Sequence, residues 1–189
     1  SYSALTLNSL NIVDATTSVT LGGAVAATTT VDINSGESID QTGAITTASN
    51  VNYDAGTTIA INAGITNSGT VDIDSTGTTT IAAAGDINSD GAVTFGAALA
   101  GSLTTAGDID TSDDNVTFTN PVTLSGNVDI DTVGTAAGNI LFSSTIATGG
   151  NDLALDAGSG DITLGGNLTG GGDLTVRDGA IQSYQGITA

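Results

Sequence analysis

A repeated apolar-x-apolar triplet constrains the fold of this chain more than any other feature. The triplet recurs with successive starts 21, 20, 20, 22, 23, 24, 22 and 19 residues apart. A period near twenty residues is the signature of a solenoid, in which each repeat forms one coil and stacked coils bury a continuous core. The triplets start at Leu10, Val31, Val51, Val71, Val93, Val116, Ile140 and Ile162, with a degraded copy at Ile181.

Two further apolar steps follow each triplet, so we expect three short strands in each coil. Alternation such as Val128-Asp129-Ile130 directs apolar side chains inward and polar ones outward. Gly and Asn recur between the steps, where corners need residues that tolerate positive φ. The second steps are Val19, Ile39, Ile59, Ile81, Leu103, Val122, Ile146, Leu168 and Ile187, and the third steps are Val25, Ile45, Ile65, Ile87, Ile109, Val128, Leu153 and Leu174.

The pattern therefore predicts an all-β fold, a parallel β-helix (β-solenoid) of about nine coils with 19 to 24 residues each. We expect one domain over residues 1–189 with uncapped ends, and a right-handed coil because the coil length varies. Coils stack about 4.8 Å apart, which gives a rod about 43 Å long. Phe95, Phe118 and Phe142 occupy the same position in consecutive repeats and predict an internal aromatic stack, and Tyr53 shares that position.

Charge and composition exclude several classes of partner. The chain has one basic residue, Arg177, twenty acidic residues and no His, for a net charge of −19. Nucleic acids and anionic membrane surfaces both need clustered Lys and Arg, so neither is expected as a partner. The chain has no Cys, which excludes disulfides and Cys-ligated metal sites. No apolar run reaches the roughly 20 residues that span a bilayer, so membrane insertion is not expected.

The C-terminal half resembles a known type of repeat. The similar segments are residues 114–124 (DNVTFTNPVTL), 138–146 (GNILFSSTI) and 150–162 (GNDLALDAGSGDI). These segments resemble the β-strand repeats of very large bacterial surface proteins of the filamentous-haemagglutinin type, closely over residues 107–181 and more loosely elsewhere. The resemblance implies a right-handed β-helix, export across the outer membrane to the cell surface, and a role in adhesion, biofilm or surface fibres. Arg177-Asp178-Gly179 is not an integrin-type Arg-Gly-Asp, so no specific receptor site is expected.

We therefore expect a structural, non-catalytic, secreted β-solenoid that stacks head to tail into an extracellular surface fibre. Leu5 and Leu7 fit a third strand at the start of the chain, and Ile181 and Ile187 fit a first and a second strand at its end. Two copies placed end to end would continue the repeat in phase. The alternatives are a stalk segment of a much larger secreted adhesin, and a module that binds calcium or carbohydrate, with glycans of a host or neighbouring cell as partners.

Calcium is the only cofactor that the sequence suggests. The run from Asp86 through Asn88 and Asp90 to Gly91 matches the opening of a calcium loop, but its twelfth position is Ala97 rather than Glu. A second acidic group follows closely in sequence. The candidate ligands are Asp86, Asn88, Asp90, Asp108, Asp110, Asp113 and Asp114. The competing interpretation of the same residues is a solvated acidic face.

Catalysis is not expected. Polysaccharide lyases built on β-helices need a strong base and cationic charge stabilisers, and Arg177 is the only basic residue. A glycosidase needs two carboxylates about 5–10 Å apart, one of them with a raised pKa. Nothing in the sequence indicates that a carboxylate is buried.

Overall fold

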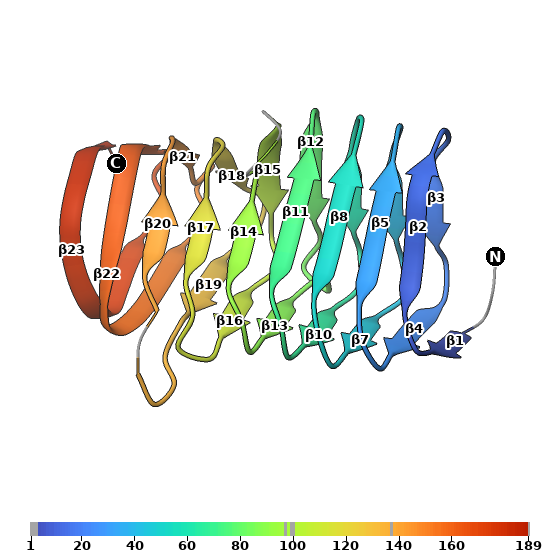
Figure 1. Ribbon diagram of the computed structural model, residues 1–189. Coiled ribbons are helices and arrows are strands. Elements are labelled where there is room, and N and C mark those ends of the chain that lie inside the picture. The colour runs from blue at the N-terminus through green and yellow to red at the C-terminus, as the bar shows by residue number, and fades with distance from the viewer. Residues whose placement is uncertain (1–3, 97, 99–100, 137, 189) are drawn as a thin grey trace.

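The computed structural model describes residues 4–188 except 97, 99, 100 and 137, and the side chains of these residues except Asp14 and 182–188. The described chain forms one parallel sheet of 23 strands, wound into a β-solenoid of about eight turns (Figure 1). The described residues contain no helix. The predicted fold class is therefore confirmed.

Each coil contributes one strand to each of three faces. On the first face lie β2 (Leu10–Ala15), β5 (Val31–Ser35), β8 (Val51–Ala55), β11 (Val71–Ser75), β14 (Val93–Phe95), β17 (Val116–Phe118) and β20 (Ile140–Phe142). On the second face lie β3 (Val19–Leu21), β6 (Ile39–Gln41), β9 (Ile59–Ile61), β12 (Thr78–Ile81), β15 (Ser102–Thr105), β18 (Val122–Leu124) and β21 (Ile146–Ala147). On the third face lie β1 (Ala4–Leu7), β4 (Ala24–Ala27), β7 (Ile45–Thr47), β10 (Ile65–Asn67), β13 (Ile87–Ser89), β16 (Ile109–Thr111) and β19 (Val128–Asp131). Finally, β22 (Leu153–Thr169) and β23 (Leu174–Thr188) each continue over all three faces.

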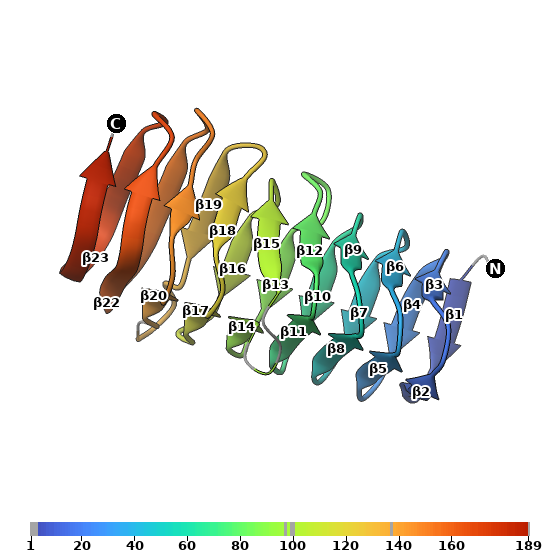
Figure 2. The ribbon, with the colours of Figure 1, turned by 90° about the horizontal axis from the view of Figure 1, so that it is seen from above.

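The coil is right-handed, as the sequence predicted. In Figure 1 the chain ascends the near, first face and advances toward the C-terminus on the left. Figure 2, seen from above, shows the second-face strands running from the near side to the far side. Ascent on the near face, passage to the rear across the top and advance to the left together describe a right-handed helix.

The register of the first face confirms the triplet ladder. Each triplet start pairs with the next, from Leu10 with Val31 through to Ile162 with Ile181. From Val31 to Ile162 these side chains are at most 1% exposed. The repeat read from the sequence is therefore the repeat by which the coils stack.

The sequence alignment is wrong by two residues at one second-face strand. Thr79, which is 4% exposed, pairs with Ile59 and with Leu103. Ile81 pairs with Ile61 instead. Thr79 hydrogen-bonds the hydroxyl of Ser75 at 3.1 Å, which allows this polar side chain to occupy a core position.

A shift of two residues also occurs at one third-face strand. Ile109 pairs with Ile130, whereas Val128 pairs with Leu153 in the following coil. A shift of two keeps the alternation of inward and outward side chains, so both Val128 and Ile130 remain buried.

The predicted aromatic stack is present in the core. The ring centroids of Phe95 and Phe118 lie 5.3 Å apart with their planes 2° from parallel, and those of Phe118 and Phe142 lie 4.4 Å apart at 11°. Tyr53 lies in the same column and is fully buried. Its hydroxyl donates to Oε1 of the equally buried Gln41 at 3.1 Å, so the polar tip has a partner.

Buried polar side chains stabilise the corner that follows the third face. Thr47, Asn67, Ser89 and Thr111 are the last residues of successive third-face strands, and all point inward. Each donates a hydrogen bond to a backbone carbonyl of its own or the preceding corner, such as Ser89 Oγ to Gly69 O at 2.7 Å. These side chains therefore add hydrogen-bond donors to the carbonyl groups of the corners.

Candidate functional site

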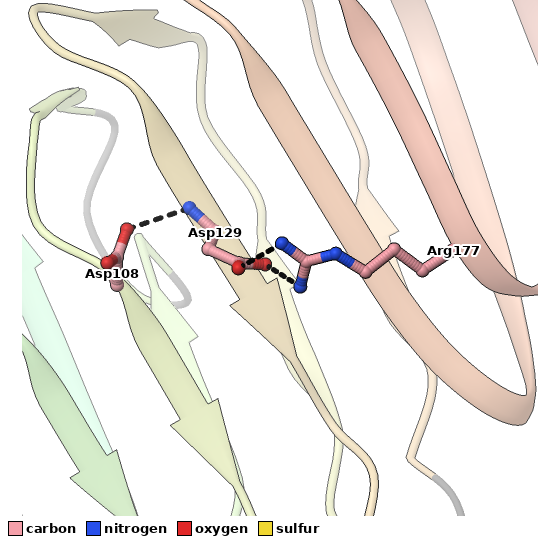
Figure 3. A network of polar contacts seen from close by, with 3 residues as sticks. All are labelled: Asp108, Asp129 and Arg177. Carbon is pink, nitrogen blue, oxygen red and sulfur yellow. Dashed lines mark hydrogen bonds and ion pairs between the residues drawn. The ribbon is translucent and has the colours of Figure 1, made fainter.

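Outward Asp and Asn side chains join neighbouring coils. Asp86 Oδ1 accepts the backbone N–H of Asp108 at 3.0 Å. Figure 3 shows the next contact of this kind, in which Asp108 Oδ1 accepts the backbone N–H of Asp129 at 2.8 Å. We call this contact, from an Asp or Asn oxygen to a backbone N–H in the next coil, an Asx clamp. Further clamps run from Asn50 to Thr70, Asp74 to Ala98, Asp113 to Ala136, Asn115 to Asn139, Asn127 to Asp152, Asn139 to Asp161 and Asp152 to Asp173.

Arg177 ties the last described coil to an earlier one. Its guanidinium donates to both oxygens of Asp129, Nη1 to Oδ1 at 2.8 Å and Nη2 to Oδ2 at 2.5 Å (Figure 3). The contact passes over the intervening coil, in which Ala154 stands between Asp129 and Thr175. The hydrogen bond and the charge of Asp129 raise the pKa of Arg177, with smaller effects from Asp156 and Asp131.

The third face carries a column of carboxylates. Asn88, Asp110, Asp131, Asp156 and Asp178 occupy one outward position in successive coils. Desolvation raises the pKa of Asp110, and the neighbouring carboxylates add to the effect, that of Asp131 most. We call this row of side chains the acidic column.

Asp113 holds the loop between β19 and β20, which projects at the lower left of Figure 1. Its φ is +72°. Oδ2 accepts the hydroxyl of Thr135 at 2.9 Å, and Oδ1 accepts the N–H of Ala136 at 2.6 Å. Desolvation opposes ionisation, but these hydrogen bonds, with those from the N–H groups of Thr135 and Gly134, lower the pKa of Asp113 overall.

The structure distributes the predicted calcium ligands over separate contacts. Asp86 and Asp108 form clamps, Asp113 holds a loop, and Asp90 accepts the Ser112 hydroxyl at 3.4 Å. Asn88 and Asp110 stand side by side in the acidic column, and the backbone carbonyl of Asp114 accepts the hydroxyl of Thr111. Among the described residues, no three or more Asp, Glu, His or Cys side chains group closely enough to hold a metal ion. Calcium binding stays a prediction.

A second carboxylate group, on the first face, lies outside the predicted calcium ligands. Asp54 and Asp74 are paired in register, and Asp72 lies two residues before Asp74 on the same strand. Desolvation raises the pKa of Asp54 and of Asp72, followed in both by repulsion from Asp74. Oδ1 of Asp72 is buried without a hydrogen-bond partner among the described residues. The signal was the spacing Asp-x-Asp at the same strand position as Asn52 and Asp54 one coil earlier.

The end coils differ from the rest in what they expose. At the N-terminal end, Leu5, Leu7, Leu10 and Ile12 are only partly buried although they occupy core columns. At the C-terminal end, Ile181 is 43% exposed. The backbone of Ile187 pairs with Leu168, and its side chain lies outside the described ones.

No family model, curated protein or solved structure matches this chain. Within the described residues no helix is long and apolar enough to cross a membrane.

Proposed function

We propose that this chain is a structural, non-catalytic part of an extracellular surface fibre, and that a second copy stacks on its end coils head to tail. The role in adhesion, biofilm or matrix follows from the resemblance to repeats of the filamentous-haemagglutinin type. The solenoid of stacked parallel coils is compatible with such a role.

The observation that carries the proposal is the incomplete burial at both end coils. In the first coil Leu10 and Ile12 are only partly buried although they continue core columns, and in the last coil Ile181 is 43% exposed. In the middle of the rod, the neighbouring coil on each side covers these core columns. An uncovered parallel edge also presents N–H and C=O groups that seek partners.

Strand polarity gives the two ends different and complementary edges. Every described strand pair is parallel, so the β23 edge of a second copy can cover β1–β3 in the same orientation that joins the coils within one chain. A contact between two different edges of identical subunits is heterologous and does not close, so it generates a filament.

Sedimentation velocity of the purified chain over a range of concentrations tests the proposal. We expect species larger than one chain that grow with concentration. Leu10→Asp places a charge in the uncovered core column and should abolish growth. Asn11→Asp adds the same charge one residue away on the outward side and is the matched control. A wild-type chain that stays monomeric at every concentration, or equal assembly by both variants, would contradict head-to-tail stacking.

The same edges support a second candidate, a stalk within a larger secreted adhesin. In a longer polypeptide, further coils of the same chain would cover Leu10 and Ile181 in place of a second copy. The mass of the native protein separates the two: a chain much longer than 189 residues favours the stalk.

A further inference from the structure

A groove runs along the corner between the third face and the first. It has a volume of about 790 Å³ and extends from Thr6 in β1 to Asp131, the last residue of β19, and Val133 just after it. Volumes of this size are typical of sites that bind organic ligands. Unlike a pocket for a small molecule, this groove crosses seven coils, so its length, about 29 Å at the coil spacing, fits an extended chain.

One half of the groove is neutral and rich in hydroxyl groups. Thr46, Thr66 and Asn88 occupy one outward column, and Ser68 lies in the parallel column two residues further on. All four side chains are exposed, and none makes a hydrogen bond within the part of the chain that the structure describes. Hydrogen-bonding groups therefore repeat along the groove at the coil spacing and are available to a ligand.

The other half of the groove is acidic. Asp90, Asp110 and Asp131 line it, and neither Lys, Arg, His nor an aromatic residue is among the lining side chains. Desolvation raises the pKa of Asp110, and repulsion from the neighbouring carboxylates, that of Asp131 first, raises it further. A cation that entered this half would relieve that repulsion, whereas an anionic chain would add to it. Outside the groove but on the same face, Asp129 already holds the cationic side chain of Arg177.

We propose that the groove binds an extended polyhydroxylated chain that carries amino groups, of the class of a linear glucosamine oligosaccharide, laid parallel to the solenoid axis. Its hydroxyl groups meet the Thr, Ser and Asn half, and its ammonium groups meet Asp110 and Asp131. The site goes beyond the proposed fibre because it uses the side of the rod and leaves both ends free.

Calorimetric titration with three hexasaccharides tests the chemistry of the ligand. The probes are the glucosamine hexamer, the N-acetylglucosamine hexamer of the same backbone without charge, and a galacturonate hexamer with negative charge. We expect the first to bind, the second to bind at least about tenfold more weakly, and the third not to bind. Equal binding of the first two, or no binding of the first, overturns the proposal.

Variants locate the binding and separate it from general attraction to an acidic protein. Thr66→Val and Asp110→Asn should each weaken binding of the glucosamine hexamer by about fivefold to tenfold. Thr123→Val on the second face and Asp173→Asn outside the groove are the matched controls and should change little. Pentalysine should bind without sensitivity to Thr66→Val. If all variants bind the glucosamine hexamer alike, the attraction is non-specific and the groove is not the site.

Discussion

The middle coils and the end coils are built from the same residues in the same columns, yet only the middle coils are closed. Ile12, Ile33 and Ile73 share one column, and Ile33 and Ile73 are at most 1% exposed, whereas Ile12 remains partly exposed. The difference lies in the presence of a coil on both sides. A single coil cannot bury its own apolar side chains, so its stability depends on its neighbours.

The largest expected effect is on the core of a middle coil. Ile73→Ala should lower the free energy of unfolding by about 2–5 kcal/mol, because it leaves a cavity that packed neighbours cannot fill. Ile12→Ala, in the same column at the N-terminal end, should cost less than half as much in the unassembled chain. Chemical denaturation of both variants and of the wild type measures the two losses of unfolding free energy. Equal losses would show that the end coil is as closed as the middle.

The Asx clamps give a smaller contrast of the same kind. Asp108→Ala removes the acceptor of the Asp129 N–H and should cost about 0.5–1.5 kcal/mol. Asp108→Asn keeps an acceptor oxygen while it removes a charge beside Asp110, so it should cost less than the Ala variant. Asp173→Ala should be nearly neutral, because no described coil follows Asp173 to be clamped. A large loss for Asp173→Ala would contradict this account.

The two environments of the Asp residues predict opposite pH dependence. Because the folded pKa of Asp72 is raised above the unfolded value of about 3.9, its unfavourable contribution disappears as pH falls through the raised pKa. The folded pKa of Asp113 is lowered, so its stabilising contribution is present above about pH 3.9 and is lost as pH falls further.

Thermal unfolding between pH 7 and pH 3 measures the contribution of Asp72. Asp72→Asn should raise the stability at pH 7 by up to about 1 kcal/mol and flatten its increase on mild acidification. Asp113→Asn should leave that increase unchanged and weaken the loop that Thr135 and Ala136 anchor. If the Asp72→Asn variant keeps the wild-type pH profile, then the Asp72 carboxylate does not cause the gain in stability on mild acidification.

The smallest expected effect is the loss of the Arg177 contact at the C-terminal end. The side chains of Arg177 and Asp129 are 46% and 35% exposed, so solvent and salt screen the pair. Arg177→Gln should reduce amide hydrogen-exchange protection in β23 and leave β11 unchanged. The difference between variant and wild type should disappear at 1 M salt. A loss of protection in β11 would indicate that the contact stabilises the whole rod.

The sequence predicted the coil, its three faces and its core columns because alternation and period depend on the identity of individual residues. The sequence pattern assigned Ile81 and Val128 to columns two residues away from their true register, because a shift of two residues preserves the alternation of inward and outward side chains. At Ile81 the true core residue is Thr79, and a polar residue type does not indicate burial. The clamps were missed although a signal existed, an Asp directly before the third strand in Asp86-Ile87, Asp108-Ile109 and Asp152-Leu153. The groove had no local signal, since it arises only when columns from seven coils stand side by side.

Electron microscopy of the purified chain at increasing concentration tests the central claim, that the uncovered end coils are joints. We expect unbranched rods whose lengths are multiples of about 43 Å, the length of one stacked unit at the coil spacing. Leu10→Asp should yield single units only, with the Asn11→Asp control indistinguishable from wild type. Single rods of about 43 Å at every concentration of the wild-type protein would contradict the claim.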